Sequence, residues 1–187
     1  MIPPLDLATG LLPQGRYPAT ADEVRDRFVA APDFGQSQCR ADLWENWTEH
    51  VQILQALLGH EPRTWMAGSF ISSKPEPSDI DVFYGFDPEA YDALETEDLA
   101  YIEQLCTRES CIKHYKLRID AYFTRLPDHM AVDDLRPQQM GVHNLQAFQS
   151  LGLYDEIWQR ARRVPATPGV SGTAPQTIRR GYLEVRL

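Results

Sequence analysis

Cysteine, long apolar runs and positive charge are all scarce in this sequence of 187 residues. The three cysteines form no CxxC pair, which argues against a disulfide framework or a cysteine-based zinc site and is typical of a reducing compartment. No apolar run approaches the roughly 20 residues needed to cross a bilayer. The first residues also lack the basic and apolar parts of a signal peptide. We therefore expect a cytoplasmic protein without membrane partners.

Basic residues are outnumbered, because 18 Lys and Arg stand against 27 Asp and Glu, for a formal net charge of −9. Such an excess of acids disfavours a large, non-specific nucleic-acid surface. It leaves open the local binding of a nucleotide or of an RNA end. The hydrophobic fraction of 43% is sufficient for a real core, and the length favours one domain.

Helices are predicted from apolar spacing and from residues that favour helix ends. Thr20 and Glu23 have the spacing of a capping box, which predicts a helix over residues 21–30. Apolar residues recur every three or four positions over residues 37–58, and Gly59 then provides a C-terminal cap. Further helices are predicted over residues 88–107, beginning at Pro88, and over residues 142–161.

Strands are predicted from short apolar runs and from period-two alternation, over residues 64–67, 80–86, 114–123 and 178–187. We expect the last of these to pair at a sheet edge, and we interpret residues 1–20, with four prolines, as an arm or loop. The predicted fold class is α+β (α/β), with a mixed, twisted sheet flanked by helices. The predicted organisation is a domain over residues 1–163, a Pro-, Gly-, Ser- and Thr-rich linker over 164–177, and a C-terminal strand over 178–187 that packs on the same domain.

Two acids open the second predicted strand, and nine residues separate them from a glycine-serine pair. Asp79 and Asp81 are two residues apart, and side chains at this spacing on a strand point to one face. Two carboxylates aimed at one point are best accommodated by a cation. The small residues Gly68 and Ser69 would let backbone N–H groups approach a phosphate closely. The pattern predicts a site for a metal-bound triphosphate.

This order of motifs resembles the signature of the polymerase-β-like nucleotidyltransferase superfamily. The likeness covers residues 60–125 and is carried by residues 66–69 and 79–82, with Asp120 as a third carboxylate on the next predicted strand. A narrower likeness, to a small bacterial nucleotidyltransferase-like family, extends over most of the chain. It is carried by residues 12–15, 19–20, 23 and 27–28, by the Lys-Pro-Glu-Pro loop at 74–77, and by residues 180–184.

The resemblance implies a minimal nucleotidyltransferase fold and a role for each motif residue. Asp79, Asp81 and Asp120 would be the catalytic carboxylates and would hold Mg²⁺ or Mn²⁺ against the triphosphate of an NTP. The metal would also relieve the repulsion among three clustered acids. Gly68 and Ser69 would bind the phosphates through backbone N–H groups and a hydroxyl.

Other residues allow two interpretations. Lys74 either neutralises phosphate charge or is a solvated loop lysine. The acidic pair taken alone could be a solvated turn, and Asp120 alone could be an exposed acid on a half-solvated strand. Tyr115 and Tyr122 could stack on a base or simply belong to the core or surface. His114, His129 and His143 are scattered along the chain with no ligand spacing, so we expect structural or surface roles.

Two functions follow from these features. The first is a metal-dependent nucleotidyltransferase that moves a nucleoside monophosphate from an NTP to a hydroxyl of an RNA end, a protein or a small molecule. The resemblance suggests a toxin–antitoxin or phage-defence setting, and a protein partner that completes or inhibits the site. The alternative is a catalytically inactive nucleotide-binding or interaction module.

Overall fold

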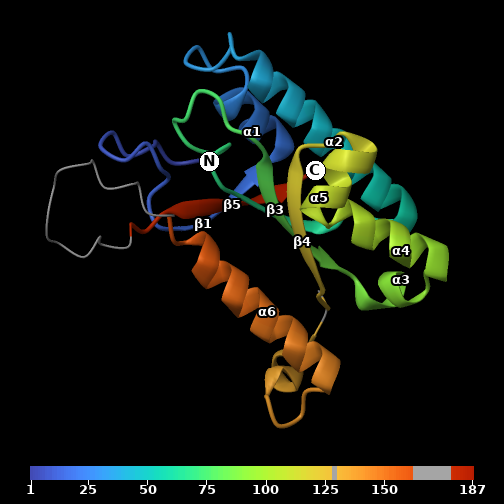
Figure 1. Ribbon diagram of the computed structural model, residues 1–187. Coiled ribbons are helices and arrows are strands. Elements are labelled where there is room, and N and C mark those ends of the chain that lie inside the picture. The colour runs from blue at the N-terminus through green and yellow to red at the C-terminus, as the bar shows by residue number, and fades with distance from the viewer. Residues whose placement is uncertain (128–129, 162–177) are drawn as a thin grey trace, which may run out of the picture.

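The computed structural model describes residues 1–127, 130–161 and 178–187, and within these ranges it contains five strands and six α-helices (Figure 1). The strands are β1 (Gly15–Thr20), β2 (Arg63–Ala67), β3 (Ile80–Phe86), β4 (Ile119–Arg125) and β5 (Gly181–Arg186). The helices are α1 (Ala21–Phe28), α2 (Gln38–Leu58), α3 (Pro88–Asp92), α4 (Thr96–Leu105), α5 (Arg108–Ser110) and α6 (Val142–Trp158), with a π-helix η1 (Cys111–Tyr115) and a 3₁₀-helix η2 (Val132–Leu135).

The five strands form one mixed sheet in the order β1-β5-β2-β3-β4. The outer pairs β1–β5 and β3–β4 are parallel, while β2 runs antiparallel to both β3 and β5. This arrangement confirms the predicted α+β class. None of the helices in the described ranges is both long and apolar enough to cross a membrane.

The helices lie on the two faces of the sheet in unequal numbers (Figure 1). On one face Tyr84 of β3 hydrogen-bonds with His50 of α2, and the same histidine contacts the Leu105 carbonyl at the end of α4. The opposite face is covered in part by α6, whose Tyr154 and Trp158 contact Phe83 of β3. The side chains of Asp81 and Asp120 belong to this second face, because they alternate with buried apolar neighbours.

Local sequence explains the helix ends that were predicted. Thr20 and Glu23 form the capping box, with N–H···O distances of 3.2 and 3.0 Å between each backbone N–H and the other side chain. At the other end of α2, Gly59 adopts a left-handed conformation with φ of 76°. These confirmed features depend on contacts between residues a few positions apart.

Four predicted elements differ from the structure. Residues 15–20 form the edge strand β1, which tolerates Pro18 because an edge strand need not donate every N–H. As a result β5 lies inside the sheet, not at its edge. The predicted helix over 88–107 is divided into α3 and α4, with residues 93–95 between them. The predicted strand over 114–123 begins only at Ile119.

The late start of β4 has a local cause. Cys111 is buried in the π-helix, and the Tyr115 ring packs on Tyr101 with centroids 5.3 Å apart. The Tyr115 hydroxyl also donates to Gln104, at 2.9 Å. Lys116, with φ of 63°, then turns the chain towards the strand.

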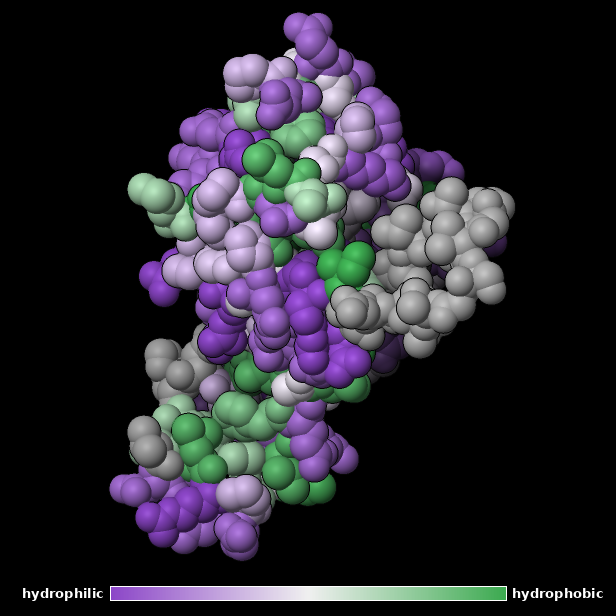
Figure 2. Space-filling model, turned by 90° about the vertical axis from the view of Figure 1, so that its left-hand side faces the viewer, coloured by the Kyte–Doolittle hydropathy of each residue, from purple (hydrophilic) through white to green (hydrophobic). Residues whose placement is uncertain are grey.

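The predicted linker over 164–177 and His129 lie outside the described residues, whereas His114 and His143 are exposed at the surface. Figure 2 shows apolar surface on the lower part of the molecule, where Figure 1 places α6 and the segment before it. The exposed apolar side chains of this region are Leu135, Val142, Leu153 and Ile157.

Candidate functional site

The glycine-serine turn and the acidic pair meet at the end of β2. Ala67, the last residue of β2, pairs with Asp81 of β3, so the chain turns directly beside the Asp81 side chain. At Gly68, which follows, φ is 80°, and a Cβ atom added there would lie 1.6 Å from Oδ2 of Asp81. A side chain at this position would displace the carboxylate, and residues other than glycine rarely adopt this φ. The two halves of the sequence motif are therefore in direct contact.

Asp81 and Asp120 lie at the same level of two neighbouring parallel strands. They are register partners in the β3–β4 pair, and neighbouring strands are about 4.8 Å apart. Each is half-buried between fully buried apolar residues, Ile80 and Val82 on β3 and Ile119 and Ala121 on β4. Like charges opposite each other destabilise a strand pair. This pair of acids is therefore a feature that sheet stability alone does not explain.

Asp79 comes one residue before β3 and is held by two neighbours. Its Oδ1 accepts a hydrogen bond from the Ser78 hydroxyl at 2.9 Å. Its Oδ2 accepts two from Arg108 of α5, at 3.2 Å from Nε and 2.9 Å from Nη2. The Asp79 side chain is 16% exposed. Asp79 thus lies at the site as half of an ion pair, outside the strand itself.

The charge of Arg108 connects all three acids. The hydrogen bond and the charge of Asp79 raise the pKa of the Arg108 guanidinium, and the carboxylates of Asp120 and Asp81 raise it further. These three carboxylates and one guanidinium therefore form a single electrostatic cluster. Nothing in the local sequence predicts this contact, because Arg108 and Asp79 are separated by 29 positions.

An aromatic surface continues from Asp120 along the same face. Tyr122, two residues further along β4, is 39% exposed, and its ring centroid lies 5.2 Å from that of Tyr154 on α6. Burial raises the pKa of both hydroxyls, and the Asp120 charge raises it further. Beyond Tyr122, a cavity of about 500 Å³ opens between the end of β4 and α6, with Thr124, His143, Gln146 and Leu153 among its lining residues.

The loop between the two motifs is organised by one buried arginine of α2. Arg40 is completely buried, and its guanidinium donates to backbone carbonyls of the loop. Burial lowers the pKa of this group to about 10, so it remains charged near neutral pH. Its acceptors are the carbonyl oxygens of Phe28 (2.9 Å), Phe70 (2.7 Å), Ser72 (2.9 Å), Lys74 (2.6 Å) and Pro75 (3.3 Å).

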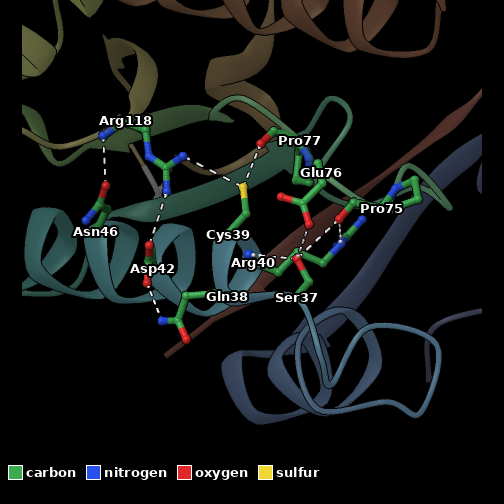
Figure 3. Close-up of polar contacts among 10 residues, drawn as sticks. All are labelled: Ser37, Gln38, Cys39, Arg40, Asp42, Asn46, Pro75, Glu76, Pro77 and Arg118. Carbon is green, nitrogen blue, oxygen red and sulfur yellow. Dashed lines mark hydrogen bonds and ion pairs between the residues drawn. The ribbon is translucent and has the colours of Figure 1, made fainter.

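Other side chains of the first turns of α2 face the same loop and the start of β4 (Figure 3). Ser37 donates to the Pro75 carbonyl at 3.3 Å, and the Cys39 thiol to the Pro77 carbonyl at 3.0 Å. Asn46 accepts the backbone N–H of Arg118, just before β4, at 3.0 Å. One helix therefore positions both the loop that leads to Asp79 and the strand that carries Asp120.

Ser69 and Lys74 occupy different parts of this loop. Ser69 is half-buried next to Gly68, and its carbonyl accepts the Ser72 hydroxyl at 2.7 Å. Lys74 is exposed, and within the described residues no ion pair connects it with the three carboxylates. The structure thus brings together Gly68, Ser69 and the three acids, but leaves Lys74 at the outside of the loop.

The chemistry of this donor set fits a hard cation such as Mg²⁺ or Mn²⁺. In the parts of the chain that the structure describes, no three His, Cys, Asp or Glu side chains are arranged so that they could hold one metal ion. Mg²⁺ commonly takes only one or two protein carboxylates and completes its octahedron with water and substrate phosphates. The adjacent Asp81 and Asp120 fit this mode, with Asp79 available if Arg108 releases it.

Sequence reasoning missed Arg108, Arg40 and Tyr154. Arg40 could have been noticed, because it lies three and seven positions before the apolar residues Leu43 and Trp47 on one stripe of α2. A charged residue on an apolar stripe indicates a buried group with fixed partners. Arg108 and Tyr154 carried no such signal, because their contacts depend on the tertiary fold.

Comparison with known proteins identifies a family but no activity. Residues 3–186 match DUF6932, a family described as being of unknown function. No curated protein and no solved structure matches the chain significantly. Since the family match extends over nearly the whole chain, the protein belongs to DUF6932, a family of unknown function.

Proposed function

We propose that this protein is a metal-dependent nucleotidyltransferase that transfers a nucleoside monophosphate from an NTP to a hydroxyl group. The observation that carries the proposal is the packing of Asp81 against Gly68, with Asp120 in register beside Asp81. A turn whose left-handed conformation favours glycine lies against a pair of acids that the sheet itself does not require. This arrangement supports a site in which carboxylates hold a cation and backbone N–H groups bind phosphates.

The residues have separate roles in this proposal. Asp81 and Asp120, joined by Asp79, would hold Mg²⁺ or Mn²⁺, which neutralises the charge that develops on the attacking and leaving oxygens. The turn at Gly68 and Ser69 would bind the β- and γ-phosphates. The bond from the acceptor oxygen to the α-phosphorus forms as the bond to the leaving pyrophosphate breaks, and the acceptor proton passes to solvent. Lys74 is proposed as a mobile phosphate contact.

The cavity, the net charge and the exposed apolar side chains near the site indicate which nucleoside and which acceptor would fit. The cavity of about 500 Å³ beyond Tyr122 is within the range of small-molecule sites. The net charge of −9 disfavours a long RNA footprint. The exposed apolar side chains Leu153 and Ile157 of α6 favour a protein as acceptor or partner over an RNA end or a small molecule. A cytoplasmic toxin–antitoxin or phage-defence setting remains part of this proposal by resemblance alone.

A second candidate is a nucleotide-binding module without transfer activity. The ion pair between Asp79 and Arg108 favours it, because one of the three acids is already neutralised within the protein. The two candidates make different predictions for the same assay, since a binding module retains the nucleotide without consuming it.

Label transfer tests the proposal. The protein is incubated with each α-labelled NTP, Mg²⁺ or Mn²⁺ and cell lysate. We expect label to enter a macromolecule or small molecule with the wild type and with Asp22→Asn, an exposed acid on α1, but not with Asp81→Asn or Asp120→Asn. Nucleotide binding without transfer would support the module. Equal transfer by wild type and both site variants would contradict the site.

A further inference from the structure

Arg108 places a positive charge at the three acids and contacts Asp79 directly. Two of its nitrogens donate to a single oxygen of Asp79, at 2.9 and 3.2 Å. The charges of Asp81 and Asp120 also favour its protonated form, so it lies within the field of all three carboxylates. Its side chain is nevertheless 48% exposed. The guanidinium is therefore held by charge and hydrogen bonds and can leave without crossing a packed core.

The geometry of this ion pair is suited to exchange. Salt bridges with this much exposure are weak, because water screens them and the long side chain loses freedom. A guanidinium binds a phosphate through the same forked geometry with which it binds a carboxylate. Asp79 keeps a second partner at its other oxygen, the Ser78 hydroxyl at 2.9 Å. Asp79 would thus stay oriented after Arg108 moves away.

We propose that Arg108 is an exchangeable counter-ion, which pairs with Asp79 while the site holds no nucleotide and moves to the triphosphate when a metal-bound nucleotide enters. This inference rests on the proposed function and adds a switch to it. No covalent bond changes in this step. The guanidinium exchanges one oxyanion for another, and Asp79 exchanges one cation for another.

The exchange couples metal and triphosphate binding. A metal ion that enters alone competes with Arg108 for Asp79. A metal ion that enters with a triphosphate does not compete with Arg108, because the guanidinium then binds the phosphates. The two ligands therefore favour each other's binding, which is a coupling between sites. Removing the guanidinium should have opposite effects on the two ligands, and a merely structural arginine would not produce this pattern.

The experiment compares Arg108→Gln with the wild type and with Arg25→Gln. Arg25 on α1 is a matched control, since its side chain is 51% exposed and pairs with Asp22 at 3.3 Å, so both variants lose one charge from an arginine that is about half exposed. Binding of Mn²⁺ alone is followed by electron paramagnetic resonance of the free ion. Binding of the preformed Mn²⁺–tripolyphosphate complex is followed by calorimetry, and thermal unfolding checks that each variant is folded.

We expect Arg108→Gln to bind Mn²⁺ alone about threefold to tenfold more tightly than the wild type, and the tripolyphosphate complex about tenfold more weakly. Arg25→Gln should match the wild type in both measurements. Arg108→Lys, which keeps the charge but not the fork, should lie between the wild type and Arg108→Gln for the tripolyphosphate complex.

Two results would overturn the inference, and they are distinguishable. If the wild type binds Mn²⁺ and Arg108→Gln binds it no more tightly, the counter-ion role is wrong while the proposed metal site stands. If neither protein binds Mn²⁺ or its tripolyphosphate complex, the proposed function fails and the exchange fails with it.

Discussion

The carboxylate of Asp81 lies directly against the Cα atom of Gly68, so that a methyl group added at Gly68 would be 1.6 Å from Oδ2 and 2.6 Å from Cγ. This contact joins two sequence motifs that are well separated along the chain. A side chain added at residue 68 would therefore have to displace the Asp81 carboxylate.

Replacing Gly68 by alanine should therefore cost more than replacing Gly59. Both residues have similar φ values, 80° and 76°, but an added Cβ at Gly59 meets nothing within 4 Å. Gly59→Ala should lose about 1–2 kcal/mol of unfolding free energy through backbone strain alone. Gly68→Ala should lose about 2–5 kcal/mol, because overpacking adds to the strain. Urea denaturation measures both, and equal losses would show that the Asp81 contact is unimportant.

Four of the five hydrogen bonds of Arg40 go to the loop before Asp79, which predicts a strong effect on this loop. Arg40→Met leaves buried carbonyls without donors and should lower the free energy of unfolding by about 3 kcal/mol or more. Arg40→Lys keeps a charge and up to three donors, so its loss should be smaller. Hydrogen exchange of the amides of residues 70–74 should be faster in both variants. Unchanged exchange there would contradict the assigned role.

Buried His50 predicts a loss of stability in acid. Its Nε2 donates to the Leu105 carbonyl at 3.1 Å, and its Nδ1 then accepts the Tyr84 hydroxyl at 3.0 Å. Burial lowers the pKa of His50 to about 4, from an ordinary value of 6.5. Between pH 6.5 and 4 the unfolded chain binds a proton that the folded chain does not. The free energy of unfolding should therefore fall by on the order of 3 kcal/mol as the pH drops through this window.

Denaturation at a series of pH values tests this effect. His50→Gln, which does not titrate, should show a flatter pH dependence between pH 6.5 and 4. The exposed His143 is the control, and His143→Gln should keep the wild-type slope. A wild-type slope in His50→Gln would assign the acid sensitivity to other groups.

Tyr122 predicts a contact with the base of the nucleotide. Tyr122→Ala should weaken binding of the preferred NTP about tenfold, because a stacking surface is lost. Binding of tripolyphosphate, which has no base, should be unchanged. Tyr115→Ala is the control, since Tyr115 of η1 packs on Tyr101 of α4 and does not lie beside Asp120. Fluorescence or calorimetric titration measures both ligands, and an equal loss for NTP and tripolyphosphate would exclude stacking.

The extent to which the sequence predicted this structure depended on the range of the contacts involved. The capping box at Thr20 and the cap at Gly59 involve neighbours in the chain, and both were predicted correctly. The bounds of β3 followed from its apolar run between Asp79 and Pro88. The interior place of β5 could not be predicted, because it depends on β1, a strand of the proline-bearing arm more than 160 positions away.

In the candidate site, too, the features carried by the sequence motifs could be predicted, and those set by contacts outside the motifs could not. The register of Asp81 with Asp120 agrees with the order of the motifs, although their proposed use by a metal remains to be tested. The contact of Arg108 with Asp79 depends on the tertiary position of α5, because the two residues are 29 positions apart. The electrostatic partner of the site was therefore invisible to pattern analysis.

Crystals grown with Mn²⁺ and an NTP analogue that resists cleavage between the α- and β-phosphates test the central claim most directly. We predict an anomalous peak bonded to Asp81 and Asp120, with the triphosphate over Gly68 and Ser69 and Arg108 turned from Asp79 to the phosphates. A nucleotide bound elsewhere, or a site without Mn²⁺ at saturating concentrations of both ligands, would contradict the account.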